Sequence, residues 1–172
     1  MANTTSLPVN ASSHVNCDKM LTDNGVFGNI YEDDAPNDCE LYGFDSLSIP
    51  AGATIDGIQV INEIEANTLT TKPVYQVYNG AWSSAVDISS TPPKRPTAVI
   101  TTPTATDYLW GLSWDATTAA AIRVKVDQST SPSESESHID YLQVTIHYTA
   151  IAIQRPLTIN GSLNVNGTLI IK

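Results

Sequence analysis

Residues 138–149, HIDYLQVTIHYT, decide the fold class of this chain. Apolar and polar residues alternate through the stretch, and the apolar series consists of Leu142, Val144, Ile146 and Tyr148. Strict period-2 alternation with β-branched and aromatic side chains is typical of a strand that buries one face. A strand of this length needs neighbours on both edges, because unpaired backbone groups invite uncontrolled pairing. We therefore predict that this stretch is the central strand of a β-sandwich.

The rest of the chain repeats this pattern in shorter segments. Dipeptides such as Asn79-Gly80 separate the segments, and such dipeptides are turn signals. Only residues 114–121 have room for a short turn of helix. We predict an all-β fold of about eight to ten strands, an antiparallel β-sandwich of the jelly-roll type. Besides residues 138–149, the expected strands lie near residues 20–21, 40–44, 47–49, 58–64, 74–78, 86–88, 99–100 and 122–126.

The sequence divides into three parts. Residues 1–14 are small and polar, and we expect an extended arm that is ordered only where something holds it. Residues 15–150 form the predicted β-sandwich domain. Residues 151–172 form a C-terminal arm, in which the sequence repeats every six residues as LTINGS, LNVNGT and LIIK.

In the C-terminal repeat, apolar residues recur at two positions, or phases, of each six-residue unit, namely the first and the third. A short β-repeat cannot bury its own apolar face, and leaving these side chains in water would forfeit on the order of 10 kcal/mol. We therefore expect the arm to serve oligomerisation or attachment, with a hairpin folded back on its own sandwich as the alternative. The expected interface residues are Leu157, Ile159, Leu163, Val165, Leu169 and Ile171.

The charge balance disfavours two classes of partner. The formal net charge is −10, from 8 Lys and Arg against 18 Asp and Glu. Without a basic stripe to displace counterions, neither nucleic acid nor an anionic membrane surface is an expected partner. The opening MANTTSLPVNASS lacks the features of a signal peptide, and no segment approaches the ~20 apolar residues of a membrane helix. We expect a soluble protein made in a cytoplasm.

Two cysteines, Cys17 and Cys39, lie far apart in the sequence. A disulfide between them is one alternative. Disulfides are rare in proteins made in a reducing cytoplasm, so the sequence favours free buried thiols. Two cysteines alone do not decide between the alternatives.

No motif points to catalysis or to a cofactor. The acidic residues within 32–40 offer oxygen ligands for Ca²⁺, but their spacing does not match an EF-hand loop, and nothing selects an acid and a nucleophile for glycosidic cleavage. The histidines have no metal-ligand spacing, and there is no Gly-x-Ser-x-Gly motif. We expect a non-enzymatic protein with no cofactor and no metal. The histidines are His14, His138 and His147, and the acidic residues are Glu32, Asp33, Asp34, Asp38 and Glu40.

The tryptophans Trp82, Trp110 and Trp114 are candidates for a sugar-binding platform. Exposed aromatic rings on β-sandwich modules offer flat surfaces for carbohydrate. The alternative is that Trp110 and Trp114 close one end of the core, where large rings contribute most to burial. The sequence favours the core alternative.

Three segments carry motifs that occur together in one known family. They are FDSLSIPAGATIDGIQV at residues 44–60, WGLSW at residues 110–114 and HIDYLQVTIHYT at residues 138–149. Together they resemble a β-sandwich domain found in virion proteins of tailed bacteriophages, and the resemblance covers about residues 15–149. The NGSLNVNGTL segment at residues 160–169 is similar to the repeats through which phage fibres and spikes trimerise.

The resemblance implies a non-enzymatic structural protein of a phage virion, namely a capsid decoration, fibre or neck/tail accessory protein. Its implied partners are further copies of itself, as a homotrimer, and other virion proteins. The implied location is the virion, assembled in the host cytoplasm. The alternative is a carbohydrate-binding or host-receptor-binding module of a tail fibre or surface adhesin, with a host surface glycan as its partner.

Overall fold

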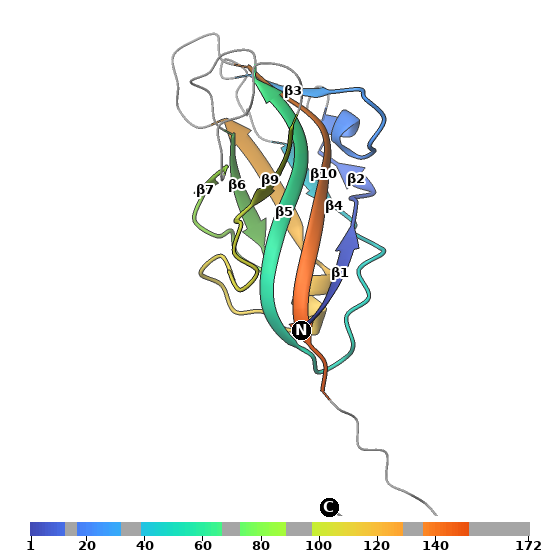
Figure 1. The fold of residues 1–172 in the computed structure, drawn as a ribbon, viewed down its shortest axis with the longest axis vertical. Helices are drawn as coiled ribbons and strands as arrows, with labels where there is room; N and C mark the ends of the chain where they lie inside the picture. Colours follow the sequence, from blue (N-terminus) through green and yellow to red (C-terminus); the bar gives the residue numbers. More distant parts are fainter. Residues whose placement is uncertain (13–16, 32–38, 67–72, 89–97, 129–135, 152–172) are drawn as a thin grey trace, which may run out of the picture.

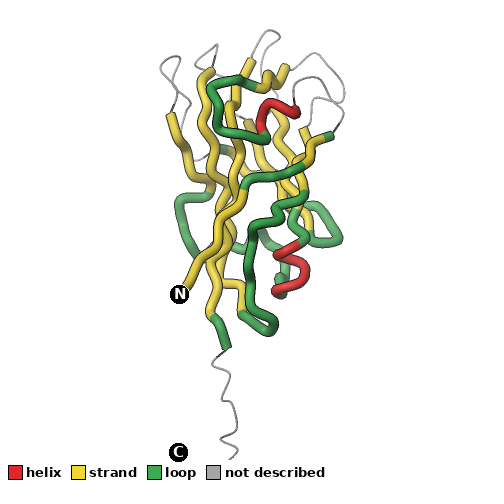
Figure 2. The backbone as a smooth tube through the Cα atoms, turned by 90° about the vertical axis from the view of Figure 1, so that its right-hand side faces the viewer, coloured by secondary structure: helices red, strands yellow, loops and turns green. Residues whose placement is uncertain are grey.

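Two antiparallel β-sheets pack face to face around one hydrophobic core (Figures 1 and 2). Most of the elements in the described residues are strands, accompanied by a short 3₁₀-helix and a short α-helix. The predicted all-β, antiparallel sandwich is therefore confirmed. The computed structural model describes residues 1–12, 17–31, 39–66, 73–88, 98–128 and 136–151.

The central strand of the first sheet is β10 (Glu136–Thr149), as predicted. β5 (Thr54–Ala66) pairs with one edge of β10 along almost all of its length, and β8 (Ala98–Thr102) follows β5. On the other edge, β1 (Ala2–Ser6) and β3 (Gly28–Tyr31) pair with opposite ends of β10. Both edges of the longest strand are thus paired, which satisfies its backbone hydrogen bonds.

The N-terminal segment belongs to this first sheet. We expected residues 1–14 to form an arm that is ordered only where something holds it. β10 holds the first part of this arm by pairing with β1. Ala2 lies opposite Tyr148 and Ser6 lies opposite Val144 in the register of the two strands. The Thr5 and Thr145 hydroxyls add a cross-strand hydrogen bond of 3.0 Å.

The second sheet is smaller, and its strands are short. β9 lies at its centre, between β4 and β6, while β2 and β7 lie at its two ends. Val124 and Val126 of β9 point into the core, whereas Arg123 and Lys125 point outward, because successive side chains of a strand face opposite ways. The strands of this sheet are β2 (Asn10–Ala11), β4 (Cys39–Tyr42), β6 (Pro73–Tyr78), β7 (Val86–Asp87) and β9 (Arg123–Gln128).

The core takes its side chains from the inner faces of both sheets. Leu142, Val144 and Ile146 of β10 are fully buried, as the alternation predicted, and Tyr148 is half-buried. Burying each aliphatic side chain of this size contributes roughly 1.5–3 kcal/mol. The other large side chains that are fully buried are Met20, Leu41, Phe44, Ile58, Val60, Ile64, Tyr75, Ile122 and Ile139.

The outer face of the first sheet is also covered, by a segment of the same chain. His147 and Gln59 lie on this face, yet they are only 7% exposed. Gln59 donates from Nε2 to the carbonyl oxygens of Pro103 and Thr104, at 3.1 Å each, so the segment after β8 crosses here. Gly57 leaves room for the crossing, because a Cβ at that position would meet the Thr106 backbone.

Cys17 and Cys39 form a disulfide with 5.5 Å between their Cα atoms. The favoured prediction of free thiols is therefore wrong. Cys17 begins the 3₁₀-helix η1 (Cys17–Met20) and Cys39 begins β4, and both residues are buried. The prediction failed because it argued from cellular compartment, whereas pairing depends on which two Cβ atoms the fold brings together.

Two short strands expected from the sequence are absent from the described residues. Met20 ends η1, and Leu21 makes only an isolated bridge to Tyr141. Residues 47–49 follow a turn in which the Leu47 N–H donates to the Phe44 carbonyl, and they lie outside any strand. Leu47 nevertheless packs against the core, which explains its apolar character.

The one predicted helix is confirmed as α1 (Ala116–Ala120). Asp115 is its N-cap: a side-chain oxygen accepts from the Thr118 N–H at 2.7 Å, and the Thr118 hydroxyl contacts the Asp115 N–H at 2.9 Å. This reciprocal pair is a capping box. The Thr118 N–H and, at 3.0 Å, the Thr118 hydroxyl both donate to the Asp115 carboxylate and hold its pKa below its usual value.

Candidate functional site

The outer face of the second sheet brings aromatic and charged side chains into adjacent positions. Arg123 on β9 lies opposite Tyr78 on β6, and Lys125 lies between Gln76 on β6 and Glu40 on β4. Side chains at alternate positions of a strand share one face, so these groups point away from the core together. We call this surface the β9 face and define it by Glu40, Tyr42, Tyr78, Trp82, Arg123 and Lys125.

Cations of the β9 face lie over its aromatic rings. The Arg123 guanidinium carbon is 5.3 Å from the ring centre of Tyr78 and 6.0 Å from that of Tyr42. The Lys125 ammonium is 4.9 Å from the ring centre of Trp82. Such cation–π contacts contribute about 0.5–1 kcal/mol each at exposed sites. They favour the arrangement in which the cations lie over the rings.

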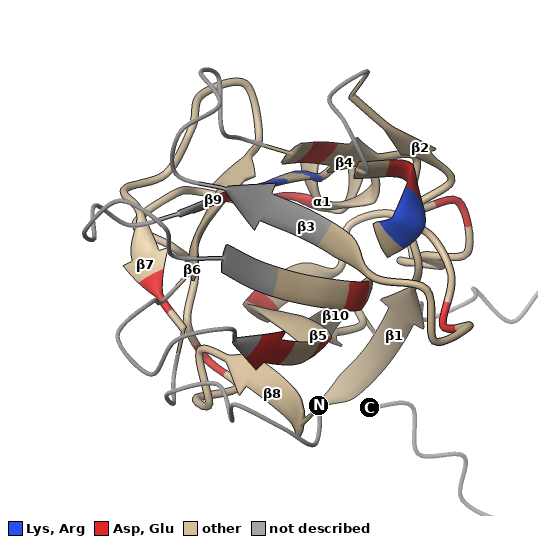
Figure 3. Cartoon of the chain, turned by 90° about the horizontal axis from the view of Figure 1, so that it is seen from above, with Lys and Arg blue, Asp and Glu red and all other residues tan. Residues whose placement is uncertain are grey.

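The β9 face is also where most described basic residues lie. The lysines and arginines of the described residues are Lys19, Arg123 and Lys125, whereas Asp and Glu occur on strands of both sheets (Figure 3). Arg123 and Glu40 form an ion pair, with 2.8 Å between Nη1 and Oε1. Their side chains are 50% and 29% exposed, so solvent screening leaves the pair worth no more than about 1 kcal/mol. The pair therefore matters more for the placement of its two charged groups than for the stability of the fold.

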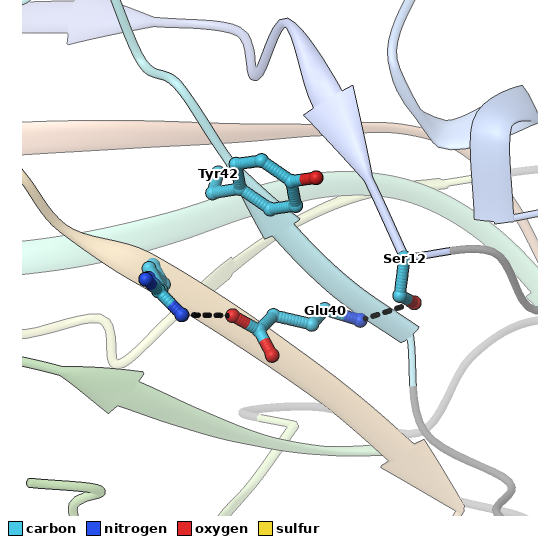
Figure 4. Close-up of a pocket in the computed structure, with 4 residues that line it drawn as sticks. Ser12, Glu40 and Tyr42 are labelled. Atoms are coloured by element: carbon cyan, nitrogen blue, oxygen red, sulfur yellow. Dashed lines mark hydrogen bonds and ion pairs between the residues drawn. The ribbon is translucent and has the colours of Figure 1, made fainter.

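A hollow of about 460 Å³ opens at the edge of the β9 face. Ser12, Glu40, Tyr42 and Arg123 line it (Figure 4). The Ser12 hydroxyl accepts a hydrogen bond of 3.1 Å from the Glu40 N–H, which fixes the end of β2 against β4. A hollow that combines an aromatic ring with a donor and an acceptor is suited to binding a polar ligand.

Trp82 reaches the β9 face through the turn after β6. Ser83 anchors this turn: its N–H donates to the Val77 carbonyl at 2.9 Å, and its hydroxyl accepts from the Val77 N–H at 3.0 Å. Trp82 bridges back to Tyr78, and the centres of the two rings are 5.2 Å apart. The turn predicted at Asn79-Gly80 is confirmed, since β6 pairs with β7 beyond it.

The other two tryptophans lie elsewhere. Trp110 is 2% exposed, and its indole N–H donates to the Ile58 carbonyl at 2.9 Å. Trp114 is half-buried, and its indole N–H donates to the Leu109 carbonyl at 3.0 Å. Burial of Trp110 fits the core alternative and leaves no face of that ring for a sugar. Of the three candidates, only Trp82 joins an outward-facing aromatic group.

A separate group of carboxylates lies at a bulge in β10. Ligand oxygens of Asp23, Glu63 and Asp140 all lie within 4.8 Å of one another, a grouping that a hard cation could use. The Asp140 carboxylate, however, already accepts backbone hydrogen bonds of 2.9–3.3 Å from residues 24–26. Burial, followed by the charges of Asp23, Glu63 and Asp140, raises the pKa of Tyr141. These hydrogen bonds give Asp140 a structural role in anchoring the loop.

The remaining residues singled out in the sequence are dispersed. His147 contacts Gln59 through Nε2 and Oε1 at 2.7 Å, and His138 contacts Glu65 at 3.1 Å. Glu40 belongs to the β9 face, while Glu32, Asp33, Asp34 and Asp38 lie outside the described residues, as does His14. The same holds for the expected interface residues Leu157, Ile159, Leu163, Val165, Leu169 and Ile171.

Comparison with known proteins leaves these sites without an assigned role. No family model, no curated protein and no solved structure matches the chain. Within the described residues, no helix has the length and apolar character needed to span a bilayer.

Proposed function

We propose that this protein is a non-enzymatic structural component of a phage virion, which assembles through its β-sandwich and its C-terminal arm. Such a subunit would serve as a capsid decoration protein, a fibre protein or a neck/tail accessory protein. Its partners would be further copies of itself, as a homotrimer, and other virion proteins. The observation that carries the proposal is the six-residue apolar repeat at residues 157–172.

The place where the chain leaves the sandwich supports this proposal. β10 ends at Thr149, at the same pole as the N-terminus, and Ile151 is 61% exposed (Figure 1). An arm that begins at the surface can extend toward a neighbour without disturbing the core. Arms of this kind bind by adding a strand to a neighbouring sheet and by filling apolar pockets beside it.

Removal of the arm tests the proposal. A chain ending at Pro156 is expected to remain folded by circular dichroism but to become monomeric in light scattering and to lose binding to virus particles. Leu163→Asp should have the same effect in the full chain, because it buries a charge in the expected interface. Thr168→Asp, which lies in neither apolar phase of the repeat, is the matched control. An unchanged mass and undiminished particle binding after truncation would refute the proposal.

A second candidate function is carbohydrate or host-receptor binding by a tail-fibre or adhesin module. The outward aromatic group of Tyr42, Tyr78 and Trp82 on the β9 face favours it. Trp82→Ala is expected to weaken binding on a glycan array while leaving the circular dichroism spectrum unchanged. Equal binding by the variant would remove Trp82 from the site.

A further inference from the structure

We infer that the β9 face binds a neutral, hydroxyl-rich saccharide, with one sugar ring in the hollow beside Tyr42 and two adjacent hydroxyl groups bridging Glu40 and Arg123. This inference deepens the second candidate function by naming the ligand class and the contacting residues. It does not depend on the proposed virion assembly.

The Glu40–Arg123 pair supplies an acceptor beside a donor. The two contacting atoms are 2.8 Å apart, and both side chains are partly exposed at the hollow. A carboxylate has two oxygens and a guanidinium has five N–H groups, so the ion pair uses only part of the capacity of each group. Each hydroxyl of a sugar both donates and accepts. Two neighbouring hydroxyls therefore fit this pair better than one charged group would.

Tyr42 supplies the apolar surface that the C–H face of a sugar ring needs. Its residue exposure is 38%, although it lies on a strand within the sheet. The Arg123 guanidinium carbon lies 6.0 Å from the centre of its ring. A tyrosine side chain has only two rotatable χ angles, so ordering it on binding costs little entropy. Rigid aromatic contact with a few placed polar groups is the usual composition of a small-ligand site.

The charge of the molecule favours a neutral sugar over an acidic one. The net charge is −10, and a field of that sign repels a polyanion as it approaches. On the β9 face itself, Glu40 neutralises Arg123 and lies opposite Lys125. One anion therefore partly neutralises the two cations of this face, which can act as hydrogen-bond donors.

The face is wide enough for more than one sugar unit. Tyr42 on β4 and Tyr78 on β6 are separated by β9, which places the two strands about 10 Å apart. Trp82 lies against Tyr78 on the far side. A short oligosaccharide that crosses β9 can contact both aromatic ends, so the site should prefer a chain to a monosaccharide.

Affinity electrophoresis of the full-length protein tests this inference. The probes are dextran, mannan and galactan as neutral polysaccharides, with polygalacturonate as the acidic one. Retardation by at least one neutral probe is expected. Tyr42→Ala and Glu40→Gln should each raise the dissociation constant obtained from the retardation at least tenfold. Tyr108→Ala is the matched control, because Tyr108 is 39% exposed but lies after β8, away from the β9 face.

The outcomes separate this inference from the proposed assembly. Retardation by no neutral probe, retardation by polygalacturonate alone, or equal retardation of the Tyr42→Ala variant would each overturn it. Glu40→Gln keeps the size of the side chain, so weaker binding by this variant does not reflect a loss of fold. The chain ending at Pro156 should bind the probe as the full chain does, whatever its oligomeric state.

Discussion

The carboxylate of Asp140 is a buried side chain that organises a loop. It is 1% exposed and accepts hydrogen bonds from the N–H groups of residues 24–26. Hydrogen bonds to a charged group contribute more than neutral ones, about 1.5–3 kcal/mol, and Asp140 accepts three of them.

Asp140→Ala is therefore expected to lower the free energy of unfolding by about 3 kcal/mol, measured by urea denaturation. Asp23→Ala removes an exposed member of the same carboxylate group and should change the free energy by less than about 0.5 kcal/mol. Equal effects of the two substitutions would show that the loop does not depend on Asp140.

The side chain of Tyr75 is fully buried in the core, and its hydroxyl finds no hydrogen-bond partner in the part of the chain that the structure describes. A buried, unsatisfied hydroxyl costs about 1–3 kcal/mol. Tyr75→Phe keeps the ring and removes the hydroxyl, so we expect the free energy of unfolding at pH 7 to rise by about 1 kcal/mol. Tyr108→Phe, at an exposed ring, should leave it unchanged.

The same tyrosine predicts how stability depends on pH. Burial raises the pKa of Tyr75 above the value of about 10 that the phenol has in the unfolded chain. The folded state therefore retains the proton that the unfolded state loses, so stability is complete below about pH 10 and falls as the pH rises further. Thermal unfolding at pH 8 and pH 11 should show a smaller alkaline decrease in the Tyr75→Phe variant than in the wild type.

At the scale of elements, the disulfide ties η1 to β4. It closes a loop with a sequence separation of 22, for which the loss of chain entropy in the unfolded state corresponds to about 3 kcal/mol. The double variant Cys17→Ala, Cys39→Ala should lose about this much stability in urea denaturation. Treatment of the wild type with a reductant should bring it to the same midpoint. An unchanged midpoint under reduction would contradict the prediction.

Alternation predicted the long elements because each of them buries one face. β10, β5, β6 and β9 all lie where the period-2 pattern indicated, and the N-cap Asp115 lies at the start of the predicted helix. β7 falls within the strand expected near residues 86–88, whereas β2 is two residues long, which is too short for a pattern to appear. The polar strand β1 has no apolar face of its own, and its place depends on a partner more than a hundred residues away.

The candidate site was less predictable than the fold, because it depends on register. Tyr42, Tyr78 and Arg123 come from three strands, and only the pairing of β9 with both neighbours brings them together. The sequence did single out Trp82 as a candidate, and it favoured a core position for Trp110, which is buried. An alternation that includes Arg123 and Lys125 indicates an outward face, yet it cannot indicate which aromatic rings lie beside them.

At the scale of the whole molecule, the described residues form one hydrophobic core. Every buried hydrophobic residue of the described chain lies between Cys17 and Ile146. Deleting residues 157–172 is therefore expected to shift the thermal midpoint of the sandwich by no more than about 2 °C at low protein concentration, where assembly is absent. A large decrease, measured by circular dichroism, would mean that the arm folds back on its own domain.

The pairing of Ala2 with Tyr148 also has a practical consequence. Because the first and last strands run side by side in opposite directions, the entry and exit points of the domain are neighbours on one pole. Adjacent ends of this kind let a domain be inserted into a surface loop of a larger polypeptide without stretching the host. They also allow the ends to be joined by a short peptide and new ends to be opened elsewhere, so the domain is suited to use as a genetic cassette.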